Sequence, residues 1–213
     1  MKVVSSYGVE IKKQNIPIRH TLYIYRQAVG YLIRVYEESW EELSRIVNPQ
    51  KRFNAAEHLV HSTKKNRARY DFDQKFPKMP SYLRRSAIQH ALGSVSSYET
   101  RLELWKQKKL DGKPKLVYEN HAMPVFYRDV MYKEAENHED MAFLKLYDGH
   151  DWKWFSVNLL HTDMEYLRKN WSGVKSSAPT LEKRYHKYFL RFSYTEEVSL
   201  SKKEVNEQII CSV

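Results

Sequence analysis

A dense cluster of basic side chains between residues 51 and 85 is the strongest chemical signal in the sequence. Only three acidic residues lie in the same segment. Cations at this density can replace counterions condensed on a phosphate backbone, so the cluster predicts salt-dependent nucleic-acid binding. The alternative is a solvated helix surface. The cluster consists of Lys51, Arg52, Lys64, Lys65, Arg67, Arg69, Lys75, Lys78, Arg84 and Arg85.

Aromatic side chains are interspersed with these cations. Tyr70, Phe72 and Phe76 lie among them. Aromatic rings beside cations are typical of surfaces that stack unpaired bases. The same rings could equally be core side chains of a loop, and the sequence leaves both interpretations open.

Residues for other chemistries are sparse. His58 and His61 have the spacing of two metal ligands on one helical turn, but no third ligand completes a zinc motif, so ordinary surface or core histidines are favoured. The sequence contains no G-x-S-x-G, P-loop or G-x-G-x-x-G motif. We therefore expect no catalytic residue, metal site or cofactor in this chain.

The charge is distributed unevenly along the chain. Residues 1–110 hold 21 basic and 10 acidic groups, whereas residues 111–213 hold 15 basic and 16 acidic groups. An excess confined to the first half favours a polyanionic partner there. Cys211 is the only cysteine, and no signal peptide or membrane span is evident, so we expect a cytoplasmic protein without a membrane partner.

The first half of the chain has mainly helical periodicity. A short strand is expected over residues 1–13, followed by a long helix from Pro17 to the Asn48-Pro49 terminator. Further helices are expected over residues 54–66 and 81–108. Their apolar stripes predict a three-helix bundle within residues 17–110.

The second half alternates apolar and polar residues with a period of two. Residues 143–147 and 152–157 flank Asp148-Gly149-His150-Asp151, which predicts a hairpin. A strand over 188–198, a helix over 164–171 and a loop over 172–180 complete an α+β fold: a β-barrel-like module with the helical bundle inserted after its first strand. Residues 205–213 have the pattern of a buried strand, which suggests that the chain is truncated.

The segment Phe76–Gly93, which contains Arg84-Arg85-Ser86-Ala87-Ile88-Gln89, resembles the recognition-lobe helix of TnpB (OrfB) transposon-encoded RNA-guided DNA nucleases, relatives of type V CRISPR effectors. Further resemblance covers most of the chain. It extends over residues 7–40, 145–157, 179–198 and 205–213.

This resemblance implies a domain plan and a set of partners. Residues 1–16 and 111–204 would form a wedge domain, residues 17–110 a recognition domain, and residues 205–213 the start of a truncated RuvC-like nuclease domain. The nuclease carboxylates and their divalent metal would then lie outside this chain, which would not cleave DNA alone. Its partners would be a guide RNA and double-stranded DNA with a short transposon-adjacent motif.

The resemblance also implies roles for individual residues. Arg85 and Gln89 would read the DNA motif, because Arg can bond guanine and Gln adenine through two hydrogen bonds. Tyr127 and Arg128 would lie against the same duplex. The remaining cations, Lys51, Arg52, Lys64, Lys65, Arg67, Arg69, Lys78 and Arg84, would hold nucleic-acid phosphates, and Tyr70, Phe72 and Phe76 would stack bases.

Two alternatives remain open at this point. The chain could be a non-catalytic RNA-binding or scaffold protein whose basic bundle binds ribosomal or other structured RNA. The nuclease half could also be supplied by a separate chain. Motif-specific duplex binding distinguishes the TnpB-like hypothesis from the scaffold hypothesis, because only the former predicts it.

Overall fold

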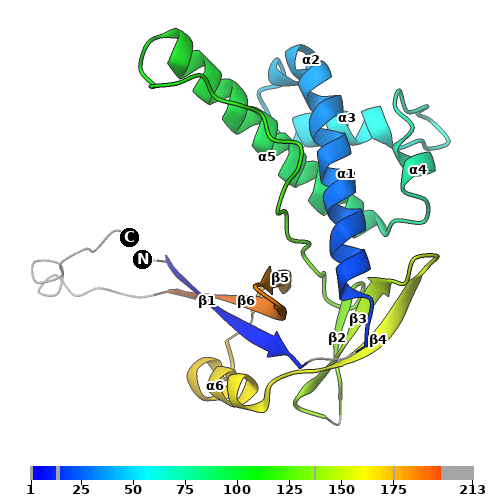
Figure 1. The fold of residues 1–213 in the computed structure, drawn as a ribbon, viewed down its shortest axis with the longest axis vertical. Coiled ribbons are helices and arrows are strands. Elements are labelled where there is room, and N and C mark those ends of the chain that lie inside the picture. Colours follow the sequence, from blue (N-terminus) through cyan, green and yellow to red (C-terminus); the bar gives the residue numbers. More distant parts are fainter. Residues whose placement is uncertain (1, 13–14, 137, 175, 198–213) are drawn as a thin grey trace, which may run out of the picture.

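The structure is a computed structural model that describes residues 2–12, 15–136, 138–174 and 176–197. Along the chain, helices α1 to α5 follow the first strand and precede the later strands (Figure 1). The helices are α1 (Ile18–Glu38), α2 (Trp40–Ser44), α3 (Pro49–Val60), α4 (Phe72–Lys75), α5 (Ser81–Lys106) and α6 (His161–Trp171). The strands are β1 (Lys2–Ile11), β2 (Tyr132–Glu134), β3 (Met141–Tyr147), β4 (Trp152–Asn158), β5 (Thr180–Arg184) and β6 (Lys187–Glu197). The strand expected over 205–213, with Cys211, lies outside the described residues.

The bundle core is the contact between α1 and α5. The apolar stripe predicted for the first long helix is buried, with Leu22, Tyr25 and Leu32 almost without solvent exposure. Leu83 and Ala87 on α5 are equally buried. The three-to-four-residue spacing therefore identified the inward faces of both helices correctly, because that spacing places side chains on one side of a helix.

The first helical segment is shorter than its periodicity predicts. It breaks at Ser39, whose backbone leaves helical geometry (φ −101°, ψ 9°) and whose hydroxyl lies 3.2 Å from the hydroxyl of Tyr70. Asn48 and Pro49 begin α3 rather than ending a helix. The Asn48 side chain accepts a hydrogen bond from the backbone N–H of Lys51 (3.0 Å), and Pro49 occupies the first turn, where its missing N–H costs nothing.

The strands form two three-stranded antiparallel sheets, ordered β1–β6–β5 and β2–β3–β4. The hairpin of β3 and β4 is confirmed, and Gly149 in its turn has a φ of +106°, which glycine adopts readily. Within the described residues neither sheet closes into a barrel, although an isolated bridge at Ile11–Leu159 links the end of β1 to the residue after β4, and another at Val125–Thr180 links the loop before β2 to β5. The α+β class is confirmed; β2 and β5 were not predicted, because each is only three to five residues long.

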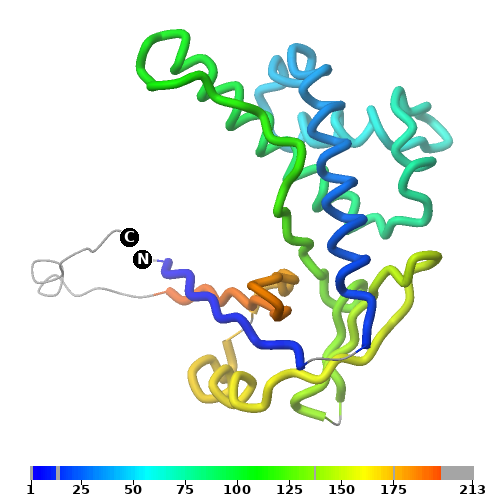
Figure 2. The backbone as a smooth tube through the Cα atoms, viewed as in Figure 1, coloured from blue at the N-terminus to red at the C-terminus, as the bar shows by residue number. Residues whose placement is uncertain are grey.

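After α5, the chain returns along the bundle to the sheets (Figure 2). Tyr118 and Asn120 in this returning segment lie against α1: the Tyr118 hydroxyl donates to Glu37 (2.6 Å), and the Asn120 amide donates to the carbonyl of Arg26 (3.1 Å). The contact is close because α1 carries Gly30 there. A Cβ atom at Gly30 would lie 2.7 Å from the carbonyl oxygen of Tyr118.

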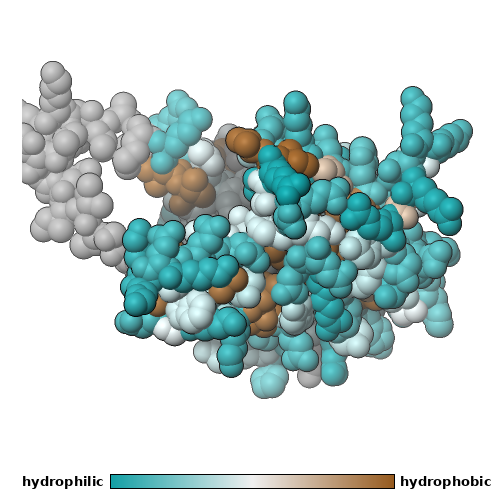
Figure 3. Space-filling view, turned by 90° about the horizontal axis from the view of Figure 1, so that it is seen from above, coloured by the Kyte–Doolittle hydropathy of each residue, from teal (hydrophilic) through white to brown (hydrophobic). Residues whose placement is uncertain are grey.

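The face of the molecule viewed from above is covered mainly by hydrophilic side chains, with hydrophobic ones scattered among them (Figure 3). No helix among the described residues combines the length and apolar character needed to cross a membrane.

Candidate nucleic-acid interface

A groove of about 660 Å³ lies between α3, the first half of α5 and the loop that contains Tyr127. Four of its lining residues are aromatic, two are arginines and two are glutamines. Aromatic faces can stack on bases, while guanidinium and amide groups can bond base edges. The lining residues are Trp40, Pro49, Gln50, Arg52, Phe53, Tyr82, Arg85, Gln89, Leu92, Gly93, Ser96 and Tyr127.

Arg85 is held in the groove by its contact with an aromatic ring. Its guanidinium carbon lies 5.0 Å from the centre of the Phe53 ring, and its Nε is 4.0 Å from a carboxylate oxygen of Glu57. The side chain remains 47% exposed. Stacking on Phe53 restricts the guanidinium without occupying most of its N–H groups, so the group is pre-positioned to donate to an acceptor in the groove.

Gln89 lies one helical turn after Arg85 and is exposed on the same face of α5. Tyr82, one turn before Arg85, contacts Tyr127, and the centres of their rings are 4.8 Å apart. This contact brings the loop after residue 124 against α5. The structure therefore places Arg85, Gln89 and Tyr127, three of the four residues predicted to read DNA, around one groove.

Arg52 also lines the groove, but its donors are partly occupied. Its Nε donates to the carbonyl of Ile46 (3.0 Å), and its guanidinium lies 5.7 Å from the Trp40 ring. Arg52 therefore ties the start of α3 to the segment after α2. A phosphate contact by Arg52 would use its remaining N–H groups.

A hydrogen-bonded trio joins α5 to α1. The Tyr25 hydroxyl is 2.9 Å from Ser86 Oγ and 2.9 Å from His90 Nδ1. Burial raises the pKa of Tyr25 and lowers the pKa of His90. Both groups are therefore neutral near pH 7, and the trio joins the two helices rather than supplying an activated nucleophile.

Arg128 does not join the other predicted DNA-reading residues. Its guanidinium pairs with Glu134 and Ser176 and lies 5.3 Å from the Tyr132 ring. These partners line a different pocket, between the sheets and α6. Arg128 therefore lies outside the groove that contains Arg85, because the neighbouring residues Tyr127 and Arg128 line different pockets.

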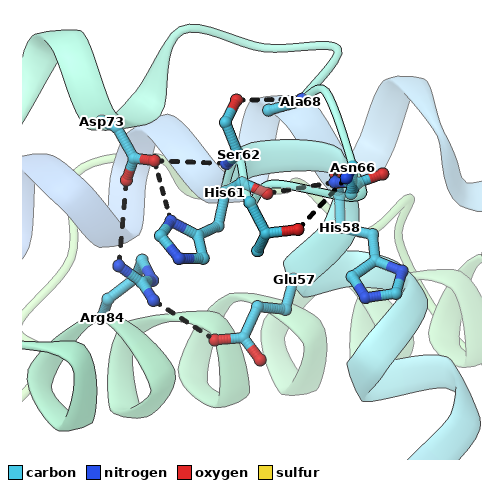
Figure 4. Close-up of polar contacts among 9 residues, drawn as sticks. Glu57, His58, His61, Ser62, Asn66, Ala68, Asp73 and Arg84 are labelled. Atoms are coloured by element: carbon cyan, nitrogen blue, oxygen red, sulfur yellow. Dashed lines mark hydrogen bonds and ion pairs between the residues drawn. The ribbon is translucent and has the colours of Figure 1, made fainter.

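Arg84 belongs to a charge network inside the bundle (Figure 4). Its Nη2 is 3.5 Å from a carboxylate oxygen of Glu57, and its Nη1 is 3.8 Å from a carboxylate oxygen of Asp73. The other carboxylate oxygen of Asp73 lies 2.8 Å from Nδ1 of His61. Only 10% of the Arg84 side chain is exposed. The structure therefore gives Arg84 protein carboxylates as partners, so we assign it a structural role in place of the predicted phosphate contact.

Two of the three aromatic residues predicted to stack bases belong to the core. Phe72 is fully buried and Phe76 is 9% exposed, and their rings pack together with centres 4.9 Å apart. Tyr70 is partly buried, and its hydroxyl donates to Glu38 at 3.3 Å. Of the two interpretations left open by the sequence, the core interpretation is correct for Phe72 and Phe76.

The remaining cations predicted to contact phosphates differ in whether they are already paired with an acidic side chain. Arg69 pairs with Glu42 at 3.1 Å, and Lys78 pairs with Asp151 at 3.3 Å. The others are exposed, and among the described residues none of them forms an ion pair. They are Lys51 near the groove and Lys64, Lys65 and Arg67 beyond the C-terminal end of α3.

No group of three or more potential metal ligands occurs among the residues that the structure describes. His61 contacts Asp73, while His58 is drawn apart from this pair (Figure 4). His58 is exposed, and His61 is partly buried.

Several groove residues were missed by the sequence interpretation, namely Trp40, Gln50, Phe53 and Tyr82. A local signal for part of the groove was available. Tyr82, Arg85 and Gln89 recur at steps of three and four, which places them on one outward face of the helix. The contributions of Trp40 and Phe53 come from other elements and depend on their packing against α5.

Comparison with known proteins identifies a family for this sequence. No curated protein matches the sequence. The sequence profile of the Aq_aa04 family matches residues 5–148, a segment that contains every residue of the groove. Since this match covers more than half of the chain, the protein belongs to the Aq_aa04 family.

Proposed function

We propose that this protein binds nucleic acid, with the α3–α5 groove contacting bases. The observation that carries the proposal is the position of Arg85 on the Phe53 ring, one turn from Gln89 and open to the groove. A stacked arginine beside an amide provides donors and acceptors in fixed positions, which suits the edges of bases.

The distribution of charge supports the same proposal. Residues 1–110 carry the excess of basic side chains, and Lys51, Lys64, Lys65 and Arg67 are exposed without ion-pair partners among the described residues. Unpaired surface cations retain their full attraction for phosphate. They would supply sequence-independent affinity, while the groove would supply selectivity.

We further propose that the protein is the nucleic-acid-binding portion of a TnpB-like, transposon-associated system. The support is the sequence resemblance centred on residues 76–93, together with a helical bundle placed between β1 and the later strands. In this proposal a wedge domain and an inserted recognition bundle hold a guide RNA and DNA with a short adjacent motif. The nuclease domain and its divalent metal would then lie outside residues 1–213, on the same polypeptide or on a separate chain.

A non-catalytic RNA-binding or scaffold protein is the second candidate. The observation favouring it is the position of Lys64, Lys65 and Arg67, which lie at the opposite end of α3 from the groove residues Gln50 and Phe53. Phosphate contacts there need no sequence motif. Binding of structured RNA without motif-dependent duplex binding would favour this candidate.

Replacing Arg85 with alanine should weaken motif-dependent DNA binding about 10-fold or more while leaving the affinity for guide RNA nearly intact. A bidentate contact to the correct base contributes roughly 1–3 kcal/mol of discrimination. The measurement is a pair of gel-shift titrations. One uses DNA duplexes selected from a randomised library for binding to this protein, and the other uses guide RNA transcribed from the DNA that flanks its gene. Arg45→Ala is the matched control, since Arg45 is exposed and lies outside the groove lining. Equal losses for DNA and RNA would refute base reading by Arg85.

Removing the exposed cations of the loop after α3 should change the salt dependence of binding rather than its selectivity. For Lys64, Lys65 and Arg67 changed together to alanine, we expect the slope of log affinity against log salt to fall by about 2–3, since each phosphate contact contributes roughly 0.9. The ratio of affinities for selected and random duplexes should stay constant. The matched control changes Lys12, Lys169 and Lys183, three exposed cations of the β part of the chain. An unchanged slope in the first variant would show that the loop does not contact phosphate.

A further inference from the structure

The β2–β3–β4 sheet has one buried and one open face. Its inward residues are apolar and almost unexposed, and they include Ala142, Leu144 and Val157. Strand residues alternate between faces, and strand pairing places cross-strand partners on the same face. The register assigns Lys133, Phe143, Lys145, Trp154 and Ser156 to the other face, together with Met141, Asn158, Tyr147 and Trp152. At the hairpin end this face is covered, because Trp152 is only 8% exposed and Tyr147 packs against the core, so its open part is the remainder.

Two of the aromatic residues on this face, Phe143 and Trp154, are not used by the core. Trp154 is 39% exposed, and Phe143 is only partly buried. Neither belongs to the buried cluster or to the partly buried residues packed against it. The solvated face of an antiparallel sheet is usually polar, so two large rings there point to a function other than folding.

The strand register places these two rings far enough apart for each to contact a different base. Phe143 is paired with Ser156, and Trp154 is paired with Lys145, so the two aromatic residues are diagonal neighbours. Diagonal neighbours across an antiparallel pair are about 7–8 Å apart. The small Ser156 side chain leaves space beside Phe143, and each ring could receive one base.

The same face carries positive charge. Lys133 is paired with Phe143 across the strands, and its Nζ lies 4.8 Å from the centre of the Trp154 ring. Neither Lys133 nor Lys145 forms an ion pair among the described residues, whereas Glu134, next to Lys133 in sequence, is engaged by Arg128. The Lys133 ammonium therefore lies beside the Trp154 ring, and Lys145 is the cross-strand partner of Trp154, both without an ion-pair partner among the described residues.

We infer that the open face of the β2–β3–β4 sheet binds unpaired nucleotides of RNA, with bases stacked on Phe143 and Trp154 and phosphates held by Lys133 and Lys145. This inference rests on the proposed nucleic-acid function, and it assigns the single-stranded part of the RNA to a surface distinct from the groove. Bases inside a duplex are already stacked on both sides, so only an unpaired strand can offer its base faces to these rings.

The test uses the full chain and a fluorescent oligouridine of about twelve nucleotides, within the range of known single-strand sites. Fluorescence anisotropy at constant salt would measure its affinity. Trp154→Leu, which keeps an apolar side chain but removes the ring, should weaken binding about five-fold or more, because base–aromatic stacking is lost. Trp154→Phe should retain most of the affinity, and Tyr185→Leu, at an aromatic residue that is 94% exposed in the β5–β6 turn, should have no effect.

The outcomes separate this inference from the function of the groove. Arg85→Ala should leave oligouridine binding within about two-fold, even though it weakens motif-bearing duplexes. Loss of oligouridine binding in Trp154→Leu, with unchanged duplex binding in Arg85→Ala, would support RNA binding at the sheet and contradict base reading in the groove. Absence of oligouridine binding by the unaltered protein, equal affinities of Trp154→Leu and Trp154→Phe, or much tighter binding of the corresponding deoxy-oligonucleotide would overturn the assignment to RNA at this face.

Discussion

Alanine in place of Arg84 should lower the free energy of unfolding by about 2–4 kcal/mol. Arg84 is 10% exposed and is the cation opposite Glu57 and Asp73, whose side chains are 18% and 42% exposed. Removing one partner of a buried pair typically costs about 3–5 kcal/mol, and the partial exposure of the carboxylates reduces this figure. Urea denaturation followed by circular dichroism would measure the change.

Arg85→Ala provides the control, because it removes the same kind of side chain from the next position of α5. Arg85 is 47% exposed, and its contact with Glu57 is a weak one at 4.0 Å. Exposed pairs contribute roughly 0–1 kcal/mol, so stability should change by no more than about that amount. A small loss of stability in both variants would contradict a structural role for Arg84 and reopen its assignment to nucleic-acid binding.

Alanine at Gly30 should destabilise the protein by about 2 kcal/mol, even though alanine is the better helix former. The new Cβ would lie 2.7 Å from the carbonyl oxygen of Tyr118, a backbone atom that cannot rotate away. The returning segment is also held to α1 by Tyr118 and Asn120, so relieving the overlap strains those hydrogen bonds. Overpacking costs roughly 1–3 kcal/mol and exceeds the helix-propensity gain of about 1 kcal/mol.

Gly93→Ala is the matched control for this prediction. Gly93 also lies within a helix, but a Cβ there would have no atom within 4 Å. Only the helix-propensity gain then remains, and stability should rise by about 0.5–1 kcal/mol. Calorimetry should show the midpoint temperature moving down for Gly30→Ala and up for Gly93→Ala, by about 2–4 °C per kcal/mol for a chain of this size. Shifts of the same sign would show that contact with Tyr118 does not determine the outcome at Gly30.

Much of the fold could be predicted because periodicity and turn chemistry act over a few residues. The apolar spacing of α1 and α5, and the Asp148-Gly149 turn between β3 and β4, identified these elements from the sequence. The break at Ser39 was missed because the apolar stripe continues across it. Its backbone turn accompanies a contact with Tyr70, thirty-one positions away, which no local pattern can reveal.

The candidate site was predicted only in part, for a similar reason. Arg85 and Gln89 share one face of α5, and that relation follows from helical spacing alone. Arg84 and Arg85 are indistinguishable as residue types, yet one is enclosed by Glu57 and Asp73 while the other lies on Phe53. The difference depends on where α3 and the α4 region pack around α5.

The sequence by itself therefore determined the inward faces of α1 and α5, the β3–β4 hairpin and the basic character of the first half, because these properties depend on neighbouring residues and on composition. Only the tertiary structure decided which cations and aromatic rings remain open to a ligand. It buried Phe72, directed Arg128 away from the groove and brought Trp40, Phe53 and Tyr127 to α5. Burial and pairing arise from contacts between distant segments, and such contacts are formed only when the elements pack together.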